Sequence, residues 1–258
     1  MASPDIHPSA CVSPHANLAD GVVVKPFAVI EDNVEIGANC VIGPHAVIHK
    51  YVRMGSGNKI HAHAVIGDLG HDIGFDENLE TWVHIGDDNT IREGVTIHRA
   101  TNPETTTTLG NRAFLMAYAH IAHDCQVGDD VIFSNNICLG GHVDVGNKVV
   151  LGGAVVIHQF SRIGDFVMCA GFMAVRKDVM PYTMVAGDPA RHFRLNTVGL
   201  RRSGVKGDKY KILEKAYREI RGGNRTLDGI EETEQVLHLK AWLAADSKRG
   251  LTGFLKEK

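Results

Sequence analysis

Histidine is the residue type through which this sequence most clearly suggests chemistry. The chain has 15 histidines in 258 residues, and five of them lie in its central part: His98, His120, His123, His142 and His158. An imidazole titrates near neutral pH and can remove a proton from a substrate, and a carboxylate beside it can orient the ring and stabilise its cation. Asp124 directly follows His123. Three neutral imidazoles can instead hold Zn²⁺, so residue types alone allow a general base or a metal site.

Apolar residues recur at every sixth position, and this period predicts how the histidines are arranged in space. One series runs from Ile6 to Ile66, and a second, shifted by one residue, runs from Ile85 to Val175 with Pro103 as the only non-apolar residue in step. A helix has a period of 3.6 and a lone amphipathic strand a period of 2, whereas a parallel β-helix of hexapeptide repeats has a period of six. The fold class predicted for most of the chain is therefore an all-β solenoid.

The repeat places three of the histidines close to one another. Three hexads close one triangular coil, so residues 18 apart should stack about 4.8 Å above one another. The core positions 121, 139 and 157 have this spacing. Because His123, His142 and His158 follow these positions by two, three and one residues, we expect their side chains beside one corner, within about 10 Å. Three histidines in register next to Asp124 favour a functional site over scattered surface residues.

The solenoid pattern covers residues 1–190 with two interruptions. Residues 67–84 lose the hexad phase, and residues 100–108 keep the phase but lose the apolar residue. Both are predicted to be loops that protrude from corners, where repeat proteins place binding residues. Residues 191–258 are predicted to form a small α-helical domain, because the apolar residues follow a helical period from about Leu195 onward.

Composition and charge narrow the class of protein. No apolar stretch approaches 18 residues and the N-terminus lacks the features of a signal peptide, so we expect a cytoplasmic protein with no transmembrane segment. The five cysteines form no CxxC pair and are expected to be reduced structural thiols. Residues 190–258 hold 16 Lys and Arg against 9 Asp and Glu, which suits an acidic partner or phosphates. No aromatic and basic interleaving accompanies this charge, so nucleic acid is not an expected partner.

Several motifs in a fixed order resemble those of one enzyme family. The sequence contains AHIAHDC, then GGHV and VIHQF, and later NTVGLRRSG and SKRGL. These motifs resemble the UDP-N-acetylglucosamine O-acyltransferases that begin lipid A synthesis in Gram-negative bacteria, and IHPSA and IGDDNTIREGVTIHR extend the likeness to nearly the whole chain. Hexapeptide β-helices of this kind are left-handed, so the resemblance implies a left-handed solenoid.

The resemblance implies a reaction and an assembly. A 3-hydroxyacyl group would move to the 3-hydroxyl of UDP-N-acetylglucosamine. The donor would be the phosphopantetheine thioester of acyl carrier protein, with no metal and no separate cofactor. The enzyme would be a homotrimer whose sites lie between subunits.

The resemblance also implies roles for particular residues. His123 would remove the proton from the acceptor hydroxyl, Asp124 would orient His123, and the backbone N–H of Gly141 would stabilise the developing oxyanion. Seven further residues would contact donor or acceptor: His71, Asp72, His98, His120, His142, His158 and Gln159. Asn196 and Arg202 match positions that contact the nucleotide.

The chain departs from the family pattern at the acceptor contacts. Where the family commonly has Gln-Asp-Leu-Lys, residues 71–74 are His-Asp-Ile-Gly, and two tail positions that are often Glu and Arg are Val198 and Ser203. A related enzyme that acylates an amino sugar nucleotide on nitrogen is therefore an open alternative, and it would still need a base at His123.

Acyl length in the family depends on the bulk of one side chain. Gly171 stands at that position. The absence of a side chain there implies a long acyl chain, although Met173 and Pro189 could shorten the channel.

Two rival functions use the same repeat. A γ-type carbonic anhydrase is also a hexapeptide β-helix and binds zinc through three histidines, but only two residues separate the histidines of AHIAHDC, and the enzyme needs no long helical tail. A non-catalytic scaffold needs only the repeat. It gives no reason for His123 to stand beside Asp124 or for the basic C-terminal segment.

Overall fold

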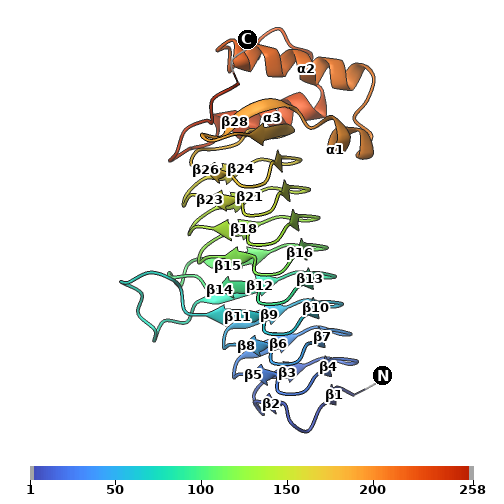
Figure 1. Ribbon diagram of the computed structural model, residues 1–258, viewed down its shortest axis with the longest axis vertical. Coiled ribbons are helices and arrows are strands. Elements are labelled where there is room, and N and C mark those ends of the chain that lie inside the picture. The colour runs from blue at the N-terminus through green and yellow to red at the C-terminus, as the bar shows by residue number, and fades with distance from the viewer. Residues whose placement is uncertain (1–2, 256–258) are drawn as a thin grey trace.

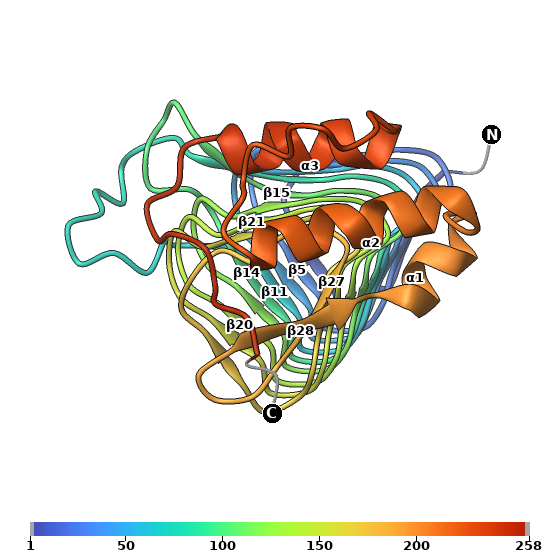
Figure 2. The same cartoon turned by 90° about the horizontal axis from the view of Figure 1, so that it is seen from above.

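The chain folds into a long parallel β-helix that is capped by three helices. The computed structural model describes residues 3–255. Figure 1 shows short strands stacked along the long axis, with the N-terminus at one end and the helices at the other. Viewed along this axis, the coils have a triangular outline (Figure 2). The predicted all-β solenoid is confirmed, and it is left-handed.

Each complete coil contributes one strand to each of three parallel sheets, which we call sheets I, II and III. Sheet I contains β1 (Asp5–Ile6), β4 (Val23–Val24), β7 (Val41–Ile42), β10 (Lys59–Ile60), β13 (Thr90–Ile91), β16 (Phe114–Leu115), β19 (Ile132–Phe133), β22 (Val150–Leu151), β25 (Met168–Cys169), β27 (Thr183–Ala186) and β28 (Arg191–Leu195). Sheet II contains β2 (Cys11–Val12), β5 (Val29–Ile30), β8 (Val47–Ile48), β11 (Val65–Asp68), β14 (Thr96–His98), β17 (His120–Ile121), β20 (Cys138–Leu139), β23 (Val156–Ile157) and β26 (Ala174–Val175). Sheet III contains β3 (Asn17–Leu18), β6 (Val34–Ile36), β9 (Val52–Met54), β12 (Trp82–Ile85), β15 (Thr106–Leu109), β18 (Gln126–Val127), β21 (Asp144–Val145) and β24 (Arg162–Ile163).

Strand pairing shows that 18 residues make one uninterrupted coil. Val23 pairs with Val41, and Ile121 pairs with Leu139. The spacing rises to 31 residues between β10 and β13 and to 24 residues between β14 and β17, because a loop is inserted in these coils. The second insertion adds one hexad length and so leaves the phase unchanged. Pro103, which appeared in step with the repeat, therefore lies in a loop and not in the core.

One apolar side chain of each hexad fills the interior. Every such residue from Ile30 to Val175, apart from the loop position of Pro103, is at most 4% exposed. Burying an aliphatic side chain of this size stabilises the fold by about 1.5–3 kcal/mol. Ile6 was expected in the core but is 42% exposed. It lies in the first coil, which has no coil beneath it.

Both predicted loops emerge from the corner between sheets II and III, which we call the II–III corner. They are shorter than the repeat pattern predicts. Strand β11 extends to Asp68 and β12 begins at Trp82, so the first loop spans 69–81. Strand β14 ends at His98 and β15 begins at Thr106, so the second spans 99–105. The added strand residues pair across the insertions, as Trp82 does with Thr106.

Three helices close the C-terminal end of the solenoid: α1 (Thr197–Arg202), α2 (Asp208–Arg221) and α3 (Glu234–Ala244). Their buried side chains form a second apolar core with Met180 and Tyr182 of the last coil. Residues 191–195, predicted as part of the helical domain, instead form β28, which pairs antiparallel with β27. The last parallel strand of sheet I leaves an open edge, and β28 covers it. No helix within residues 3–255 is long and apolar enough to cross a membrane.

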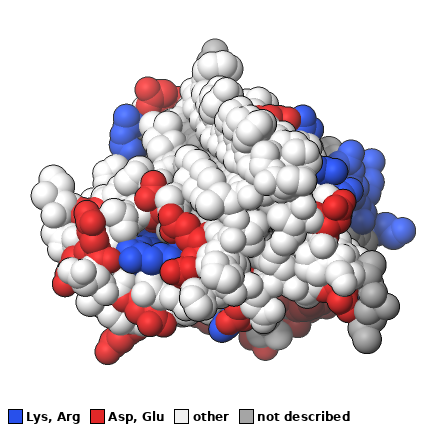
Figure 3. Space-filling view, turned by 90° about the horizontal axis from the view of Figure 1, so that it is seen from below, with Lys and Arg blue, Asp and Glu red and all other residues white. Residues whose placement is uncertain are grey.

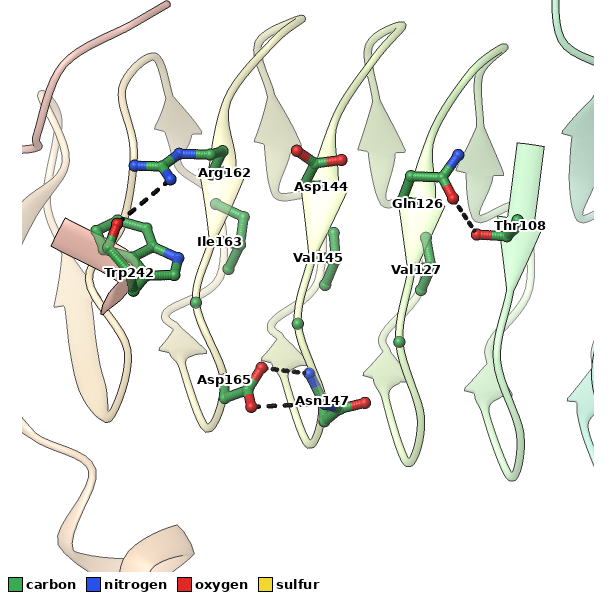
Figure 4. Close-up of a pocket in the computed structure, with 13 residues that line it drawn as sticks. Thr108, Gln126, Val127, Asp144, Val145, Asn147, Arg162, Ile163, Asp165 and Trp242 are labelled. Carbon is green, nitrogen blue, oxygen red and sulfur yellow. Dashed lines mark hydrogen bonds between the residues drawn. The ribbon is translucent and has the colours of Figure 1, made fainter. Parts of the chain in front are cut away.

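The helices and the C-terminal tail are tied to the solenoid by polar contacts. The guanidinium of Arg162 in β24 binds the buried carboxylate of Asp178 at 2.8 Å and the carbonyl of Trp242 in α3 at 3.3 Å (Figure 4). The guanidinium also lies 4.4 Å from the centroid of the Trp242 ring. Leu251 of the tail pairs with Asp178 as an isolated bridge. These contacts hold α3 and the C-terminal tail against the last coils of the solenoid.

Candidate active site

The histidines predicted to gather share the II–III corner. His123 lies in the turn between β17 and β18, His142 lies one coil later between β20 and β21, and His158 lies between β23 and β24. Asp124, His142 and Phe160 occupy the same position in three successive turns, with φ values of 59°, 57° and 64°. Asp and His adopt this left-handed backbone region more readily than most residues. The corner therefore accepts the residue types that the chemistry needs.

His123 and Asp124 form a buried hydrogen-bonded pair. The Nδ1 atom of His123 lies 2.8 Å from Oδ2 of Asp124. The same carboxylate accepts hydrogen bonds from the hydroxyls of Thr101 and Thr105. Burial opposes ionisation of Asp124, but the hydrogen bonds from His123, Thr105 and Thr101 hold the pKa of this carboxyl well below its usual range. Because Asp124 is ionised and faces Nδ1, that nitrogen carries a proton and Nε2 keeps a free lone pair.

Gly141 lies directly against the ring of His123. A Cβ atom at Gly141 would stand 2.5 Å from Nε2 and Cε1 of His123, which is closer than real contacts allow. Within residues 3–255, no backbone carbonyl accepts a hydrogen bond from the N–H of Gly141. The turn thus brings an available donor next to Nε2 of His123, and only glycine fits there.

His142 forms the next layer of the corner. Its ring meets that of His123 edge-on with centroids 5.1 Å apart, and its Nε2 atom is 3.8 Å from Oδ2 of Asp124. On its other side it stacks on Phe160 at 4.7 Å, and the ammonium of Lys248 lies 4.4 Å from the Phe160 centroid. Burial lowers the pKa of His142. At neutral pH this ring is therefore an uncharged wall of the site.

A second histidine cluster lies below the pair. His71 packs on His98 with centroids 3.8 Å apart and stacks on His120 at 5.4 Å. Nδ1 of His120 bonds the hydroxyl of Thr96 at 2.7 Å. Burial, reinforced by the neighbouring imidazoles, lowers the pKa of His120 to about 4, and burial also lowers the pKa of His98. His98 and His120 can therefore offer neutral hydrogen-bonding groups but are not cations at pH 7.

Asp72 is carried by the first loop. Its carboxylate accepts a hydrogen bond from the N–H of Gly74 at 2.8 Å, which closes a local turn. Asp72 and its neighbour Ile73 are both exposed. The ring contacts of His71 place this part of the loop beside His98 and His120. The predicted acceptor-side residues thus lie along the same corner as His123.

His158 and Gln159 share the corner but are exposed in the turn above His142, and His142 packs on Phe160 rather than on His158. The structure does not bring every predicted site residue to this corner of one chain. Gly171 lies in the turn between β25 and β26, at the opposite edge of sheet II.

Asn196 and Arg202 lie at the ends of α1, away from the His123 corner. Asn196 caps α1 through Gly199 N–H and donates to the carbonyl of Phe166. Its amide is therefore already engaged in a structural role. Arg202 is exposed in the last turn of α1. Their predicted nucleotide contacts stay predictions.

Sequence reasoning missed several residues that shape the site. Thr101 and Thr105 come from the second loop, and the run of threonines at its end, residues 105–108, could have suggested partners for a carboxylate. Phe160 is the last residue of the VIHQF motif, but the motif gave no sign that this ring would stack on His142. Lys248 reaches the corner from the tail, which no local pattern predicts.

Within residues 3–255, the one group that could hold a metal ion at this corner is a set of two histidines and one carboxylate. Ligand atoms of His123, Asp124 and His142 all lie within 4.8 Å of one another. In the structure, however, Nδ1 of His123 and Asp124 are joined to each other by a hydrogen bond. The expectation that no metal takes part stays a prediction.

Thiol chemistry is not supported at this corner. Cys125 follows Asp124, and burial raises the pKa of its thiol to about 12. All five cysteines are free, and Cys125 and Cys169 are buried in the core. A thiol with such a pKa supplies almost no thiolate at neutral pH. The arrangement instead suits a base at Nε2 of His123 with a backbone N–H beside it, as acyl transfer to a hydroxyl requires.

A separate cleft lies on the outer face of sheet III under α3. Figure 4 shows a row formed by Thr108, Gln126, Asp144 and Arg162, with Trp242 at its end. None of the predicted site residues lines it. We therefore place the candidate active site at the II–III corner.

Two family models match the chain. A model described as UDP-N-acetylglucosamine O-acyltransferase, domain 2, matches residues 178–252. A model of the bacterial transferase hexapeptide matches residues 15–50, 33–68 and 106–141. The first covers the last coil and the helices, and the second covers two stretches of the solenoid, residues 15–68 and 106–141.

Individual relatives match almost the whole chain. A protein of Alkalilimnicola ehrlichii named acyl-[acyl-carrier-protein]–UDP-N-acetylglucosamine O-acyltransferase is 49% identical, covering 95% of this chain and 98% of that protein. One of the same name from Halorhodospira halophila is 44% identical, covering 90% and 91%. Among solved structures, the UDP-N-acetylglucosamine O-acyltransferase of Moraxella catarrhalis superposes with a TM-score of 0.91 at 37% identity, covering 96% of this chain and 99% of that one. The likeness spans both the solenoid and the helices, and on this ground the chain belongs to the acyl-[acyl-carrier-protein]–UDP-N-acetylglucosamine O-acyltransferase family.

Proposed function

We propose that this protein transfers a 3-hydroxyacyl chain from acyl carrier protein to the 3-hydroxyl of UDP-N-acetylglucosamine, with His123 as the general base. The observation that carries the proposal is the buried pair of His123 and Asp124 packed against Gly141, in a chain that belongs to this family. The relatives are named for O-acylation and not for acylation of a sugar amine. They are not named as carbonic anhydrases or scaffolds.

The reaction needs one acyl transfer and two proton transfers, one to His123 and one from it. Nε2 of His123 takes the proton from the 3-hydroxyl as the oxygen attacks the thioester carbonyl. The carbonyl oxygen becomes an oxyanion, which the N–H of Gly141 stabilises. The C–S bond then breaks, and the proton on His123 passes to the leaving thiolate of the phosphopantetheine arm. Asp124 holds the ring and stabilises its cation throughout, so no covalent acyl-enzyme is needed.

Neutral histidines suit the binding of the two substrates. We assign Asp72 and His71 to the acceptor sugar, because the first loop holds them beside His98 and His120. His142 forms one wall through its stack on Phe160. We assign the remaining predicted corner contacts to donor or acceptor: His158 and Gln159.

We further propose that a second copy of the chain completes the site and that the assembly is a homotrimer. Gly171, assigned to the acyl channel, lies at the corner between sheets I and II, whereas His123 lies at the II–III corner. If the I–II corner of one copy faces the II–III corner of the next, the contact is heterologous and can close into a ring. Exposed aromatic side chains on the I–II corner support this arrangement: Phe172 is 89% exposed and Tyr118 is 67% exposed.

The distribution of charge supports acyl carrier protein as the donor's carrier. Residues 190–258 hold 16 basic and 9 acidic side chains, whereas the first 189 residues hold 11 basic and 21 acidic ones. Seen from the N-terminal end, acidic side chains gather on one side of the molecule and at scattered points of the rim, with basic side chains among them (Figure 3). Because the excess of basic side chains lies in residues 190–258, a negatively charged carrier would be steered toward the helical end. We expect the reaction to take place in the cytoplasm.

The test is a matched pair of acceptors. The purified protein is incubated with 3-hydroxyacyl carrier proteins of several chain lengths and with either UDP-N-acetylglucosamine or its 3-amino analogue, and products are identified by mass. We expect UDP-N-acetylglucosamine to be preferred by at least about tenfold in kcat/KM. A tenfold preference for the amine would overturn the assignment of the acceptor, and no transfer to either would overturn the proposed reaction.

A further inference from the structure

Arg99 is a fully buried cation in the turn that follows His98. Its side chain is 0% exposed. Within residues 3–255 its guanidinium meets carbonyl oxygens and ring faces rather than a carboxylate, and its Nε atom has no hydrogen-bond partner. Burial lowers the pKa of Arg99, yet an arginine stays protonated in proteins. A buried charge is costly unless neighbouring groups compensate it, so its position calls for an explanation.

The groups in direct contact with the guanidinium belong largely to the first loop, while the carboxylates of Glu31, Asp68 and Glu77 also favour the cation electrostatically. Arg99 donates to the carbonyl of Glu77 at 3.1 Å and to that of Leu79 at 3.3 Å. Its guanidinium carbon lies 5.3 Å from the ring centroid of Phe75, which is also in the loop, and 5.4 Å from that of Tyr51 in the solenoid. Such cation–π contacts are strengthened when the pair is removed from water. The loop therefore packs around this single side chain.

Other hydrogen bonds of the loop do not replace this anchor. Loop amides such as those of Asp72, Phe75 and Leu79 bond within the loop itself. In the described part of the chain, the backbone of residues 70–79 bonds the rest of the molecule only through Arg99. The adjacent His98 binds the carbonyl of Leu69 at 2.6 Å, at the start of the loop. The consecutive residues His98 and Arg99 thus hold both ends of the loop that carries His71 and Asp72.

We infer that Arg99 is a positioning residue that fixes the 69–81 loop and so sets the geometry of Asp72 at the acceptor side of the site. This inference rests on the proposed function, because Asp72 matters only if the corner binds a sugar nucleotide. Arg99 does not touch substrate, since its side chain is enclosed. Its loss should weaken acceptor binding through the loop while leaving His123 and Asp124 in place.

The first test measures the loop directly and does not need activity. Hydrogen exchange is compared in the wild-type protein, Arg99→Gln and Phe75→Ala. The second variant removes one ring face from the loop side and leaves the solenoid unchanged. We expect exchange of the loop amides to quicken by about tenfold or more in both, with the coils around His123 unchanged. Ile73→Ala is the matched control, because this side chain of the same loop is fully exposed.

The second test separates positioning from general destabilisation. In Arg99→Gln and Phe75→Ala we expect KM for UDP-N-acetylglucosamine to rise about tenfold, while KM for the acyl donor changes by less than about twofold. If Arg99 acts through Asp72, the effect of Arg99→Gln should largely vanish in an Asp72→Ala background, because the two losses are not additive. Full additivity, or equal changes in both KM values, would contradict the inference.

The outcomes of the two tests distinguish a failure of the anchoring role from a failure of the proposed function. A loop that exchanges as slowly in Phe75→Ala and Arg99→Gln as in wild type would overturn the anchoring role, whatever the activity. A loosened loop in a protein that acylates no sugar nucleotide, even as wild type, would leave the anchor in place but overturn the proposed function and the role of Asp72.

Discussion

Three neighbouring residues set the surroundings of the His123 ring. Asp124 is hydrogen-bonded to Nδ1, Gly141 has no side chain that would clash with the ring, and the His142 ring packs edge-on against it. Asp124 is in turn fixed by Thr101 and Thr105. A carboxylate with several donors keeps its charge even when buried. The pair is thus organised before any substrate arrives.

Replacing Asp124 with Asn should lower kcat about 10²-fold or more, because the variant loses the charge that stabilises protonated His123. The acid limb of the pH–rate profile should move to lower pH, since a base without that negative charge gives up its proton more readily. Steady-state kinetics from pH 5 to 9 measure both effects. An unchanged kcat with an unchanged profile would show that Asp124 has only a structural role.

Gly141→Ala should lower kcat about tenfold or more, while the protein still folds. The added Cβ would stand 2.5 Å from the His123 ring and displace it from its working position. Gly222→Ala, where the Cβ would make an ordinary 3.4 Å contact, is the control. Wild-type rates in Gly141→Ala would mean that the ring of His123 does not need to lie where the structure places it.

For individual residues, the sequence predicted those positions that follow directly from the repeat. The 18-residue spacing was enough to bring His123 and His142 together, because vertical stacking follows from the coil itself. The same spacing placed His158 in the next turn of this corner, but it did not predict that Phe160 stacks on His142. Arg99 gave no signal, because its partners are backbone carbonyls of a loop whose path no pattern predicts.

Among the elements, those that meet at the II–III corner carry most of the candidate site residues. The first loop, the second loop and the turn after β17 all leave sheet II on the same side. The hexad phase located both insertions, but it made them a few residues too long, because β11, β12 and β15 each have four residues whereas most strands of the coils have two. Strand β28 could not be predicted from the repeat, since it runs antiparallel to the coils.

The contact between β28, the last coil and the tail should make the protein sensitive to acid. His192 is fully buried, accepts a hydrogen bond from Met180 N–H at 3.0 Å and packs on Phe254 at 4.9 Å. Burial lowers its pKa from 6.5 to about 4. The unfolded chain therefore binds this proton first, so the stability from His192 is complete above pH 6.5 and is lost as the pH falls toward 4.

At pH 5 the loss should be about 2 kcal/mol relative to pH 7. Urea unfolding at the two pH values measures it in the wild-type protein and in His192→Gln, which cannot take up the proton. The variant should lose less stability between pH 7 and pH 5. The same loss in both proteins would place the acid sensitivity elsewhere.

For the whole molecule, the period of six predicted the architecture because the repeat is local and each coil rests on the one before it. Assembly is a different matter. The single chain leaves Gly171 and His123 at opposite edges of sheet II, and the site proposed here needs both. Under the proposed function, a second copy of the chain therefore completes the site.

In solution the protein should have three times the 28.0 kDa mass of one chain. Phe172→Asp, at the exposed I–II corner, should weaken the trimer and lower activity in parallel, because it puts a charge into the proposed interface. Leu237→Asp in α3, which is 48% exposed, should leave both unchanged. Sedimentation velocity gives the mass, and a fully active monomer would rule out the shared site.

The central claim is that His123 removes the proton from a sugar hydroxyl during acyl transfer, without a metal. The most direct test is the rate of formation of 3-O-acylated UDP-N-acetylglucosamine, followed by mass for wild type and His123→Ala after treatment of both with a chelator. The wild type should form the product at its untreated rate, and His123→Ala should be about 10² to 10⁴ slower while it keeps the same fold and mass in solution. Product formation by His123→Ala within a few-fold of wild type, or loss of wild-type activity on chelation with recovery on addition of Zn²⁺, would contradict the account.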